Sequence, residues 1–232
     1  MKEITQTIKN QWKNILLYLS GILLLGFGVN IMKASTLGAG SWDTVTINVR
    51  SFFNLTLGIP WVTMGMISFS VSAILMIVVV SYRKELKFLF MIIPIILVAI
   101  FIDMWNMFVF HDQFADTIWL KLFYYIAGTI LLPLGLSLVV KSGFPAFVFD
   151  ELMLMFVKIL KAKQITYIRL VIEFTGIVIG FIFGWIAVYP LDHNFGAVNF
   201  GSVLFAFTLS PIMSIYYKLL KVKREDSLTE VK

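Results

Sequence analysis

Six apolar runs, each close to the length needed to cross a lipid bilayer, constrain this 232-residue chain more than any other feature. They lie at about 13–32, 61–82, 88–108, 119–140, 168–189 and 196–217. A helix rises 1.5 Å per residue, so roughly 20 apolar residues span the ~30 Å hydrocarbon core. With 59% hydrophobic and 14% charged residues, the chain cannot cover a water-soluble surface with polar groups. We therefore expect an all-α, multi-pass membrane helical bundle with six transmembrane helices.

The chain carries one pattern twice, at a spacing of 107 positions. Four residues of the first copy recur in the second: Tyr18, Gly21, Gly28 and Asp43 as Tyr125, Gly128, Gly135 and Asp150. A fixed spacing of this kind indicates an internal duplication. Because each copy would hold three crossings, an odd number, the second must lie inverted in the membrane, as in many secondary transporters. We expect one membrane domain over 1–232, with three-helix repeats at about 13–108 and 119–219 and a tail at 220–232.

Each predicted repeat also holds a short apolar helix after its first span, at 41–53 and at 145–160. Both are too short to cross a bilayer, so each either lies in the interface or dips in and returns. Pro145 is predicted in the first turn of the second one. Irregular backbone at membrane depth is tolerated where protein or a water-filled cavity satisfies it. The sequence therefore favours a central cavity near the connectors that contain Gly38, Gly40 and Gly143.

The distribution of basic residues predicts the orientation of the chain. With both termini inside, the cytoplasmic segments 1–13, 82–87, 141–167 and 218–232 hold 15 of the 19 Lys and Arg residues. The external segments hold Lys33, Arg50 and Lys121, and Arg169 lies at a helix start. This asymmetry follows the positive-inside rule. We therefore expect both the N and the C terminus in the cytoplasm. An anionic inner leaflet accounts for the positive charge, so no nucleic-acid partner is needed.

Two acidic residues occupy equivalent positions near the starts of the short helices. Asp43 and Asp150 fall near the first turn, where a carboxylate interacts favourably with exposed N–H groups and the positive end of the helix dipole. One interpretation is capping. The other is a substrate or ion role, since such positions are where the half-helices of transporters meet their ligands. Both interpretations can hold together, and Glu151 follows Asp150 as a further candidate for the pathway.

Three more charged residues lie within or beside predicted spans. Arg169 and Glu173 are four apart, so they share one helix face and can pair directly. A glutamate about two turns inside a span is costly unless it is paired, protonated or wetted. We expect Glu173 to carry a proton, whereas Arg169 favours a static role in an ion pair. Asp103, near the outer end of the third span, either reaches the external headgroups or binds a proton or cation.

Glycines are spaced so that helices can approach closely. Gly21, Gly28, Gly128 and Gly135 fall in the two repeated spans, and Gly176, Gly180 and Gly184 follow one another at four-residue spacing. Small residues at such spacing let helix backbones come into contact in membranes. We expect packing within the chain, and the alternative is a face for a homo-oligomer.

Three motifs occur in the order found in one known family. They are the turn Leu37-Gly-Ala-Gly-Ser-Trp-Asp43, the segment Arg169-x-x-x-Glu173 followed by Gly176 and Gly180, and the helix from Gly201 to Pro211. The midpoint turn from Gly143 to Asp150 is a diverged copy of the first. On these motifs the chain resembles the YczE/YitT-type bacterial integral membrane family over nearly its whole length. The resemblance implies this membrane fold, a location in the bacterial plasma (inner) membrane and a suspected role in transport.

The leading hypothesis is a small secondary transporter or permease that acts on an unknown small molecule or ion and is coupled to protons. The alternative is a non-transporting membrane protein that stabilises or regulates a partner. In that case the acidic residues would tolerate neutral substitution, whereas the glycines at 176, 180 and 184 would not. We expect no enzyme, cofactor or metal site. The chain has no cysteines, and His111 and His193 fall in predicted loops.

Overall fold

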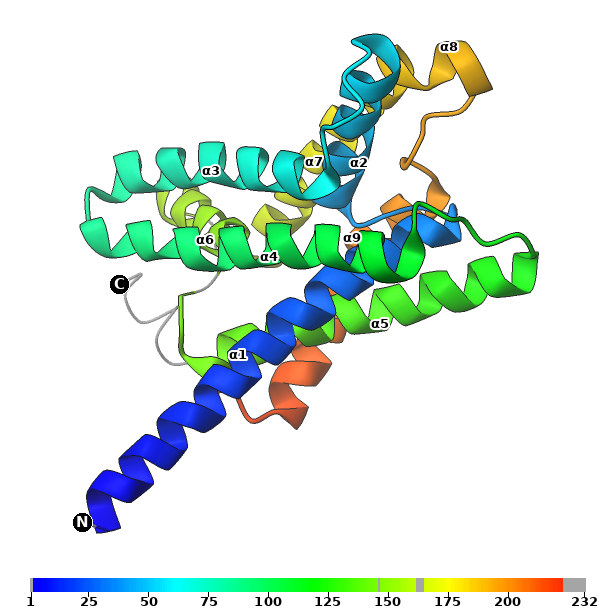
Figure 1. Ribbon diagram of the computed structural model, residues 1–232. Coiled ribbons are helices and arrows are strands. Elements are labelled where there is room, and N and C mark those ends of the chain that lie inside the picture. The colour runs from blue at the N-terminus through cyan, green and yellow to red at the C-terminus, as the bar shows by residue number, and fades with distance from the viewer. Residues whose placement is uncertain (1, 146, 162–164, 223–232) are drawn as a thin grey trace.

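The computed structural model describes residues 2–145, 147–161 and 165–222, and these form helices joined by short connections (Figure 1). Six helices are long and apolar enough to cross a membrane: Gln11–Ser35, Met64–Arg83, Leu86–Phe110, Ile118–Ser142, Ile165–Ala187 and Phe200–Leu219. Each lies within a few residues of a predicted span. The described residues thus confirm an all-helical fold with six helices able to span a membrane, as in an integral membrane protein.

The α-helices follow in the order α1 Lys2–Ser35, α2 Ser41–Ser51, α3 Met64–Arg83, α4 Ile92–Trp105, α5 Ile118–Ser142, α6 Val148–Leu160, α7 Ile165–Ala187, α8 Tyr189–Asp192 and α9 Phe200–Leu219. A π-helical turn, Phe52–Thr56, extends α2. The third span is made of three pieces, because α4 continues a 3-10 segment, Leu86–Met91, and passes into a π-helical one, Asn106–Phe110.

The long first helix of each half ends in the same local motif. Ser35 Oγ donates to the carbonyl oxygen of Met32 (2.6 Å) and accepts from the backbone N–H of Leu37 (3.2 Å). At the end of α5, Ser142 Oγ donates to Val139 O (2.6 Å) and accepts from Phe144 N–H (3.2 Å). All three pairs of residues are 107 positions apart. The duplicated sequence therefore ends its two long helices by the same hydrogen bonds.

The short helices also begin 107 positions apart, α2 at Ser41 and α6 at Val148. The first agrees with the predicted start. The second does not, because Pro145 precedes α6 instead of forming its first turn, and Phe147 is the N-cap residue. The carbonyl oxygen of Pro145 accepts a hydrogen bond from Tyr18 Oη at 3.4 Å, so this connector is tied to α1.

Helices α1 and α5 lie side by side and run antiparallel (Figure 1). A Cβ atom added to Gly21 would lie 2.8 Å from the carbonyl oxygen of Gly135, and one added to Gly135 would lie 2.8 Å from that of Gly21. A Cβ atom added to Gly28 would lie 2.8 Å from the Leu132 side chain, and one added to Gly135 would lie 2.9 Å from that of Leu25. Leu25 and Leu132 are 107 positions apart, as are Gly28 and Gly135. The contacts of one half are thus repeated by the other half with the partners exchanged.

Each short helix packs against a span of the other half, α2 against α7 and α6 against α3. The α7 side of the first contact is the row Gly176, Gly180 and Gly184, which lies against Ser41, Thr44 and Asn48 of α2. A Cβ atom on Gly176 would be 3.1 Å from the Ser41 backbone. This glycine face is covered within the chain, so it is not available as a homo-oligomer face.

Buried apolar side chains form two clusters. The first contains residues of α1, α5 and α9, among them Ile22, Leu132 and Met213, and the second contains residues of α3, α6 and α7, among them Val79, Met155 and Ile172. Large apolar side chains are also exposed on the outer faces of the spans. That exposure is ordinary for helices whose outer surface is solvated by lipid.

Candidate functional site

A cavity of about 140 Å³ lies between the first turns of α2 and α6 and is also lined by residues of α1, α3, α4, α5, α7 and α9. Four of the six charged residues singled out in the sequence line it: Asp43, Asp150, Arg169 and Glu173. They come from α2 in the first half of the chain and from α6 and α7 in the second. We call this space the acidic cavity.

The acidic cavity is built largely from pairs of residues that hold equivalent positions in the two halves. In the described part of the chain, eight pairs of lining residues are 107 positions apart: Leu25/Leu132, Val29/Leu136, Gly40/Phe147, Ser41/Val148, Trp42/Phe149, Asp43/Asp150, Val98/Phe205 and Ile102/Leu209. Arg169 and Glu173 depart from this rule, since their counterparts are Val62 and Met66. The walls and the two aspartates are thus related by the repeat, whereas Arg169 and Glu173 are not.

The two short helices meet through an aromatic pair. The ring centroids of Trp42 and Phe149 are 4.8 Å apart at an interplanar angle of 38°. Each ring immediately precedes an aspartate, so the pair brings Asp43 and Asp150 to the same space. Neither aspartate forms a hydrogen bond that caps its helix within the described residues. In this structure their shared feature is therefore the cavity that both of them line.

Three buried polar atoms of residues that line the acidic cavity have no hydrogen-bond partner among the described residues. They are Asp150 Oδ2, an acceptor, Trp42 Nε1, a donor, and Ser41 Oγ, a hydroxyl that can do either. A buried polar group without a partner costs about 1–3 kcal/mol. Most such groups in proteins are paired with protein atoms, water or a ligand. The first turns of α2 and α6 thus offer an acceptor, a donor and a hydroxyl group for a molecule held between them.

The predicted ion pair between Arg169 and Glu173 is absent. The ion pairs of the described residues join Lys33 and Arg50 to Asp112, Arg83 to Glu151, and Lys87 to Glu85. Arg169 and Glu173 instead both line the acidic cavity, and Glu173 is 9% exposed. Sharing one helix face was correctly predicted from their spacing. Direct pairing does not follow from it, since side chains from α2 and α6 share the same space.

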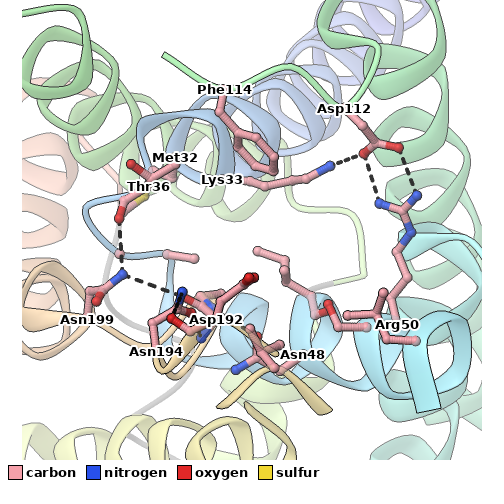
Figure 2. Close-up of a pocket in the computed structure, with 18 of the residues that line it drawn as sticks. Met32, Lys33, Thr36, Asn48, Arg50, Asp112, Phe114, Asp192, Asn194 and Asn199 are labelled. Atoms are coloured by element: carbon pink, nitrogen blue, oxygen red, sulfur yellow. Dashed lines mark hydrogen bonds and ion pairs between the residues drawn. The ribbon is translucent and has the colours of Figure 1, made fainter. Parts of the chain in front are cut away.

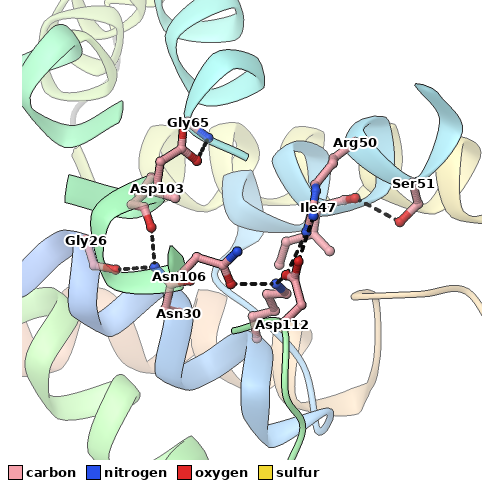
Figure 3. Close-up of polar contacts among 11 residues, drawn as sticks. Gly26, Asn30, Ile47, Arg50, Ser51, Gly65, Asp103, Asn106 and Asp112 are labelled. Atoms are coloured by element: carbon pink, nitrogen blue, oxygen red, sulfur yellow. Dashed lines mark hydrogen bonds and ion pairs between the residues drawn. The ribbon is translucent and has the colours of Figure 1, made fainter. Parts of the chain in front are cut away.

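Glu151 and Asp103 do not line the acidic cavity. Glu151 forms an ion pair with Arg83, whose Nη2 lies 3.5 Å from the Glu151 Oε2. Asp103 accepts hydrogen bonds from Thr63 Oγ1 (2.6 Å) and from the backbone N–H of Gly65 (2.8 Å), as Figure 3 shows in part. Thr63 is the N-cap residue of α3. Asp103 therefore fixes the start of α3 against the end of α4.

Two fully buried asparagines join neighbouring helices. Asn30 Nδ2 donates to Gly26 O and to Ile102 O of α4, both at 2.9 Å (Figure 3). Asn48 Nδ2 donates to Gly180 O and Phe195 O, also at 2.9 Å, and its Oδ1 accepts from the N–H of Ala197. Asn48 thus connects α2 both to α7 and to the loop that precedes α9.

A second, larger pocket of about 650 Å³ is lined by apolar side chains together with many polar and charged ones (Figure 2). Among its charged residues, Asp112 pairs with two basic ones. Arg50 binds both oxygens of the Asp112 carboxylate at 2.8 Å, and Lys33 pairs with the same group. The hydrogen bonds from Arg50 hold the pKa of the Asp112 carboxyl well below its usual range, with a further contribution from Lys33. We call this space the polar pocket.

The connector between α1 and α2 lies between the two spaces. Gly38 and Ala39 line the polar pocket, whereas Gly40 lines the acidic cavity. The connector is held on the start of α9, because Gly201 N–H donates to Leu37 O (3.0 Å) and Ala39 N–H donates to Ser202 Oγ (3.1 Å). Gly38 has φ +142°, and a Cβ atom there would collide with the backbone of Ser202. Glycine is needed because the two backbones are in contact.

Sequence reasoning missed several residues of the site. Trp42 and Phe149 could have been found, since both are aromatic and 107 positions apart, immediately before the paired aspartates. The serines that line the acidic cavity from α3, Ser68 and Ser72, carry no comparable signal. Asn48 also has none, because a polar residue in a short amphipathic helix resembles a solvated one until the partner helix is known.

Comparison with known proteins identifies the family of the chain. No solved structure matches the chain. It is similar to the uncharacterized protein YyaS of Bacillus subtilis strain 168, with 24% identity over 163 residues, which cover 70% of this chain and 77% of that protein. The model of a family of unknown function, DUF6198, matches residues 12–218, a range that contains both short helices and nearly all of the six long ones, and the chain therefore belongs to this family.

Proposed function

We propose that the chain is a small secondary transporter or permease that binds its solute in the acidic cavity. The observation that carries this proposal is the construction of the cavity from equivalent residues of two halves, with the first turns of two short helices at its centre. In transporters built from internal repeats, the substrate site lies at the repeat interface and is formed by interrupted helices. Eight pairs of lining residues match that design.

In this proposal the halves are inverted repeats in a bacterial inner membrane, with both termini in the cytoplasm. The antiparallel α1 and α5, whose glycine contacts exchange between the halves, support an inverted arrangement. The polar pocket would then face outward, since Lys33, Arg50 and Asp112 belong to predicted external segments. The connector at 38–40 would separate this outer vestibule from the solute site. The resemblance to the YczE/YitT-type family stays a prediction.

Glu173 is the proposed proton carrier. If Asp43, Asp150 and Glu173 were all ionised, the single guanidinium of Arg169 would leave the site with two uncompensated negative charges. Burial and neighbouring like charges both disfavour the ionised form of a carboxyl group. The cluster therefore retains a proton that is shared as a coupled system. A charged solute that enters the cavity would change the number of protons bound by these carboxyl groups. Solute binding and proton binding would thereby be coupled.

The test uses the purified chain reconstituted into liposomes that contain a pH-sensitive dye. Small cationic, anionic and neutral solutes are added one at a time across a range of pH gradients. We expect at least one solute to move protons across the membrane, and Glu173→Gln to abolish the effect. Glu85→Gln is the matched control, because Glu85 is an exposed loop residue paired with Lys87.

Two results would contradict the proposal. If no solute changes the internal pH, proton-coupled transport of these solutes is rejected and the accessory or regulatory alternative gains support. If Glu173→Gln moves protons as the unaltered chain does, the proton-carrier role is rejected. Substitutions at Gly176, Gly180 or Gly184 cannot decide between the alternatives. These glycines pack against α2, so bulky replacements report on folding.

A further inference from the structure

The charge of the acidic cavity favours a cation. Its lining holds the carboxylates of Asp43, Asp150 and Glu173 against the guanidinium of Arg169, and no other described lining residue is charged. The starts of α2 and α6 would attract an anion, since a helix N-terminus carries a partial positive charge. Each of them already has its own aspartate in the first turn. An anionic solute would therefore meet carboxylates at both helix ends.

Aromatic rings and an unpartnered oxygen are a second, independent observation. Trp42 and Phe149 line the acidic cavity together with Phe147 and Phe205. Ring faces attract cations, and quaternary ammonium groups in particular are held by aromatic side chains. Asp150 Oδ2 is buried without a hydrogen-bond partner in the described chain, so a carboxylate oxygen is available at the same place. Rings beside carboxylates match an organic cation better than a bare metal ion.

The size of the cavity limits the solute. About 140 Å³ corresponds to roughly four or five water-sized volumes of ~30 Å³ each. A tetramethylammonium-sized ion is of this order, whereas larger drug-like cations are not. Within the described residues, no group of three or more His, Cys, Asp or Glu side chains is arranged to hold a metal ion. The size and the donor set therefore both indicate a small organic cation.

We propose that the acidic cavity binds a small quaternary or protonated amine between the Trp42–Phe149 ring pair and the carboxylate of Asp150, and that this cation exchanges with one proton. The proposal rests on the proposed function and names its substrate class. The proton is held by the three carboxylates, which face the cavity from α2, α6 and α7, with Arg169 on α7 as the cation beside them. When the organic cation enters, one proton leaves, so the charge of the site is unchanged.

The test is equilibrium binding to the detergent-solubilised full chain, which does not require transport. Radiolabelled tetramethylammonium is compared with methanesulfonate, a small anion. We expect saturable binding of tetramethylammonium alone, release of about one proton per ion bound, and weaker binding as the pH falls. Asp150→Asn should weaken binding at least tenfold, whereas Glu85→Gln should leave it unchanged. Binding of methanesulfonate instead, or of neither ion, would overturn the proposal.

A second measurement avoids altering the binding residues. The chain has no cysteines, so Ser72→Cys on the wall of the acidic cavity introduces a single thiol. We expect a trimethylammonium-bearing thiosulfonate to label it faster than a sulfonate-bearing one, relative to the ratio of the two rates at a Ser81→Cys control, which is exposed near the end of α3. Equal relative rates, or faster labelling by the anionic reagent, would refute the cation preference.

These measurements separate the two proposals. If tetramethylammonium binds but no solute crosses the liposome membrane, the cation site stands and transport falls. If an anion or a neutral solute is transported and tetramethylammonium does not bind, transport stands and the cation assignment falls.

Discussion

Trp42 and Phe149 hold equivalent positions in the two halves of the chain, and their ring centroids lie 4.8 Å apart. Residues at equivalent positions of the 107-residue spacing are thus in contact with each other. Asp43 and Asp150 follow them immediately, so two carboxylates line the same cavity. Glu173 and Arg169 have the uncharged counterparts Met66 and Val62. The two aspartates therefore come one from each half, whereas Arg169 and Glu173 are contributed by the second half alone.

The ring pair should couple the stabilities of the two short helices. Aromatic pairs contribute about 0.5–1.5 kcal/mol beyond the area they bury. In a double-mutant cycle of Trp42→Ala and Phe149→Ala, we expect the effects to be less than additive by this amount, measured from chemical unfolding in detergent. A cycle of Trp42→Ala with Phe123→Ala, which alters an exposed ring on α5, should be additive. Additivity in both cycles would show that the rings do not interact.

The contact between α1 and α5 should not tolerate a side chain at its glycines. In Gly135→Leu the new Cβ atom would lie 2.8 Å from the carbonyl oxygen of Gly21, and backbone cannot move aside as a flexible side chain can. Overpacking typically costs about 1–3 kcal/mol and sometimes more, so we expect a clearly lower melting temperature in detergent. Ser70→Leu, on the exposed face of α3, should change it little. Equal effects of the two substitutions would mean that this close approach does not exist.

Asn48→Ala should destabilise the contact between α2 and α7. It removes two donated hydrogen bonds, to Gly180 O and Phe195 O, and leaves the N–H of Ala197 without its acceptor. The loss of buried hydrogen bonds and the unpaired groups left behind cost about 1–3 kcal/mol. Asn194→Ala, which alters an exposed loop residue, is the control. Unfolding followed by fluorescence should place Asn48→Ala well below the control in stability, and coincident curves would contradict this role.

Sequence reasoning predicted the six long helices closely because lipid imposes a length and an apolar composition that are both visible in the chain. The exact 107-residue spacing also located both short helices. Sequence reasoning failed at Pro145. The preference of proline for the first turn of a helix cannot show that the connector before α6 contacts Tyr18 of α1. Sequence reasoning also failed for the direct pairing of Arg169 and Glu173. Helical spacing shows that two residues share a face, but it does not show which side chains of other helices lie against that face. The sequence also left the role of Asp103 open between a headgroup contact and an ion site. The structure shows that it accepts hydrogen bonds from the start of α3.

The stabilising effect of Asp112 should depend on pH in a defined direction. Arg50 and Lys33 lower the pKa of this carboxyl in the folded chain, so its contribution is complete above the unfolded value of about 3.9 and is lost as the pH falls below it. Asp112→Asn should therefore lower the stability at pH 7 by about 1 kcal/mol or less, because the 43%-exposed carboxylate is screened by solvent. Because the pKa of Asp112 is lowered in the folded chain, the melting temperatures of the two proteins should converge as the pH falls from roughly 4 to 2. A difference that persists or grows on acidification would show that Asp112 acts through its shape and not its charge.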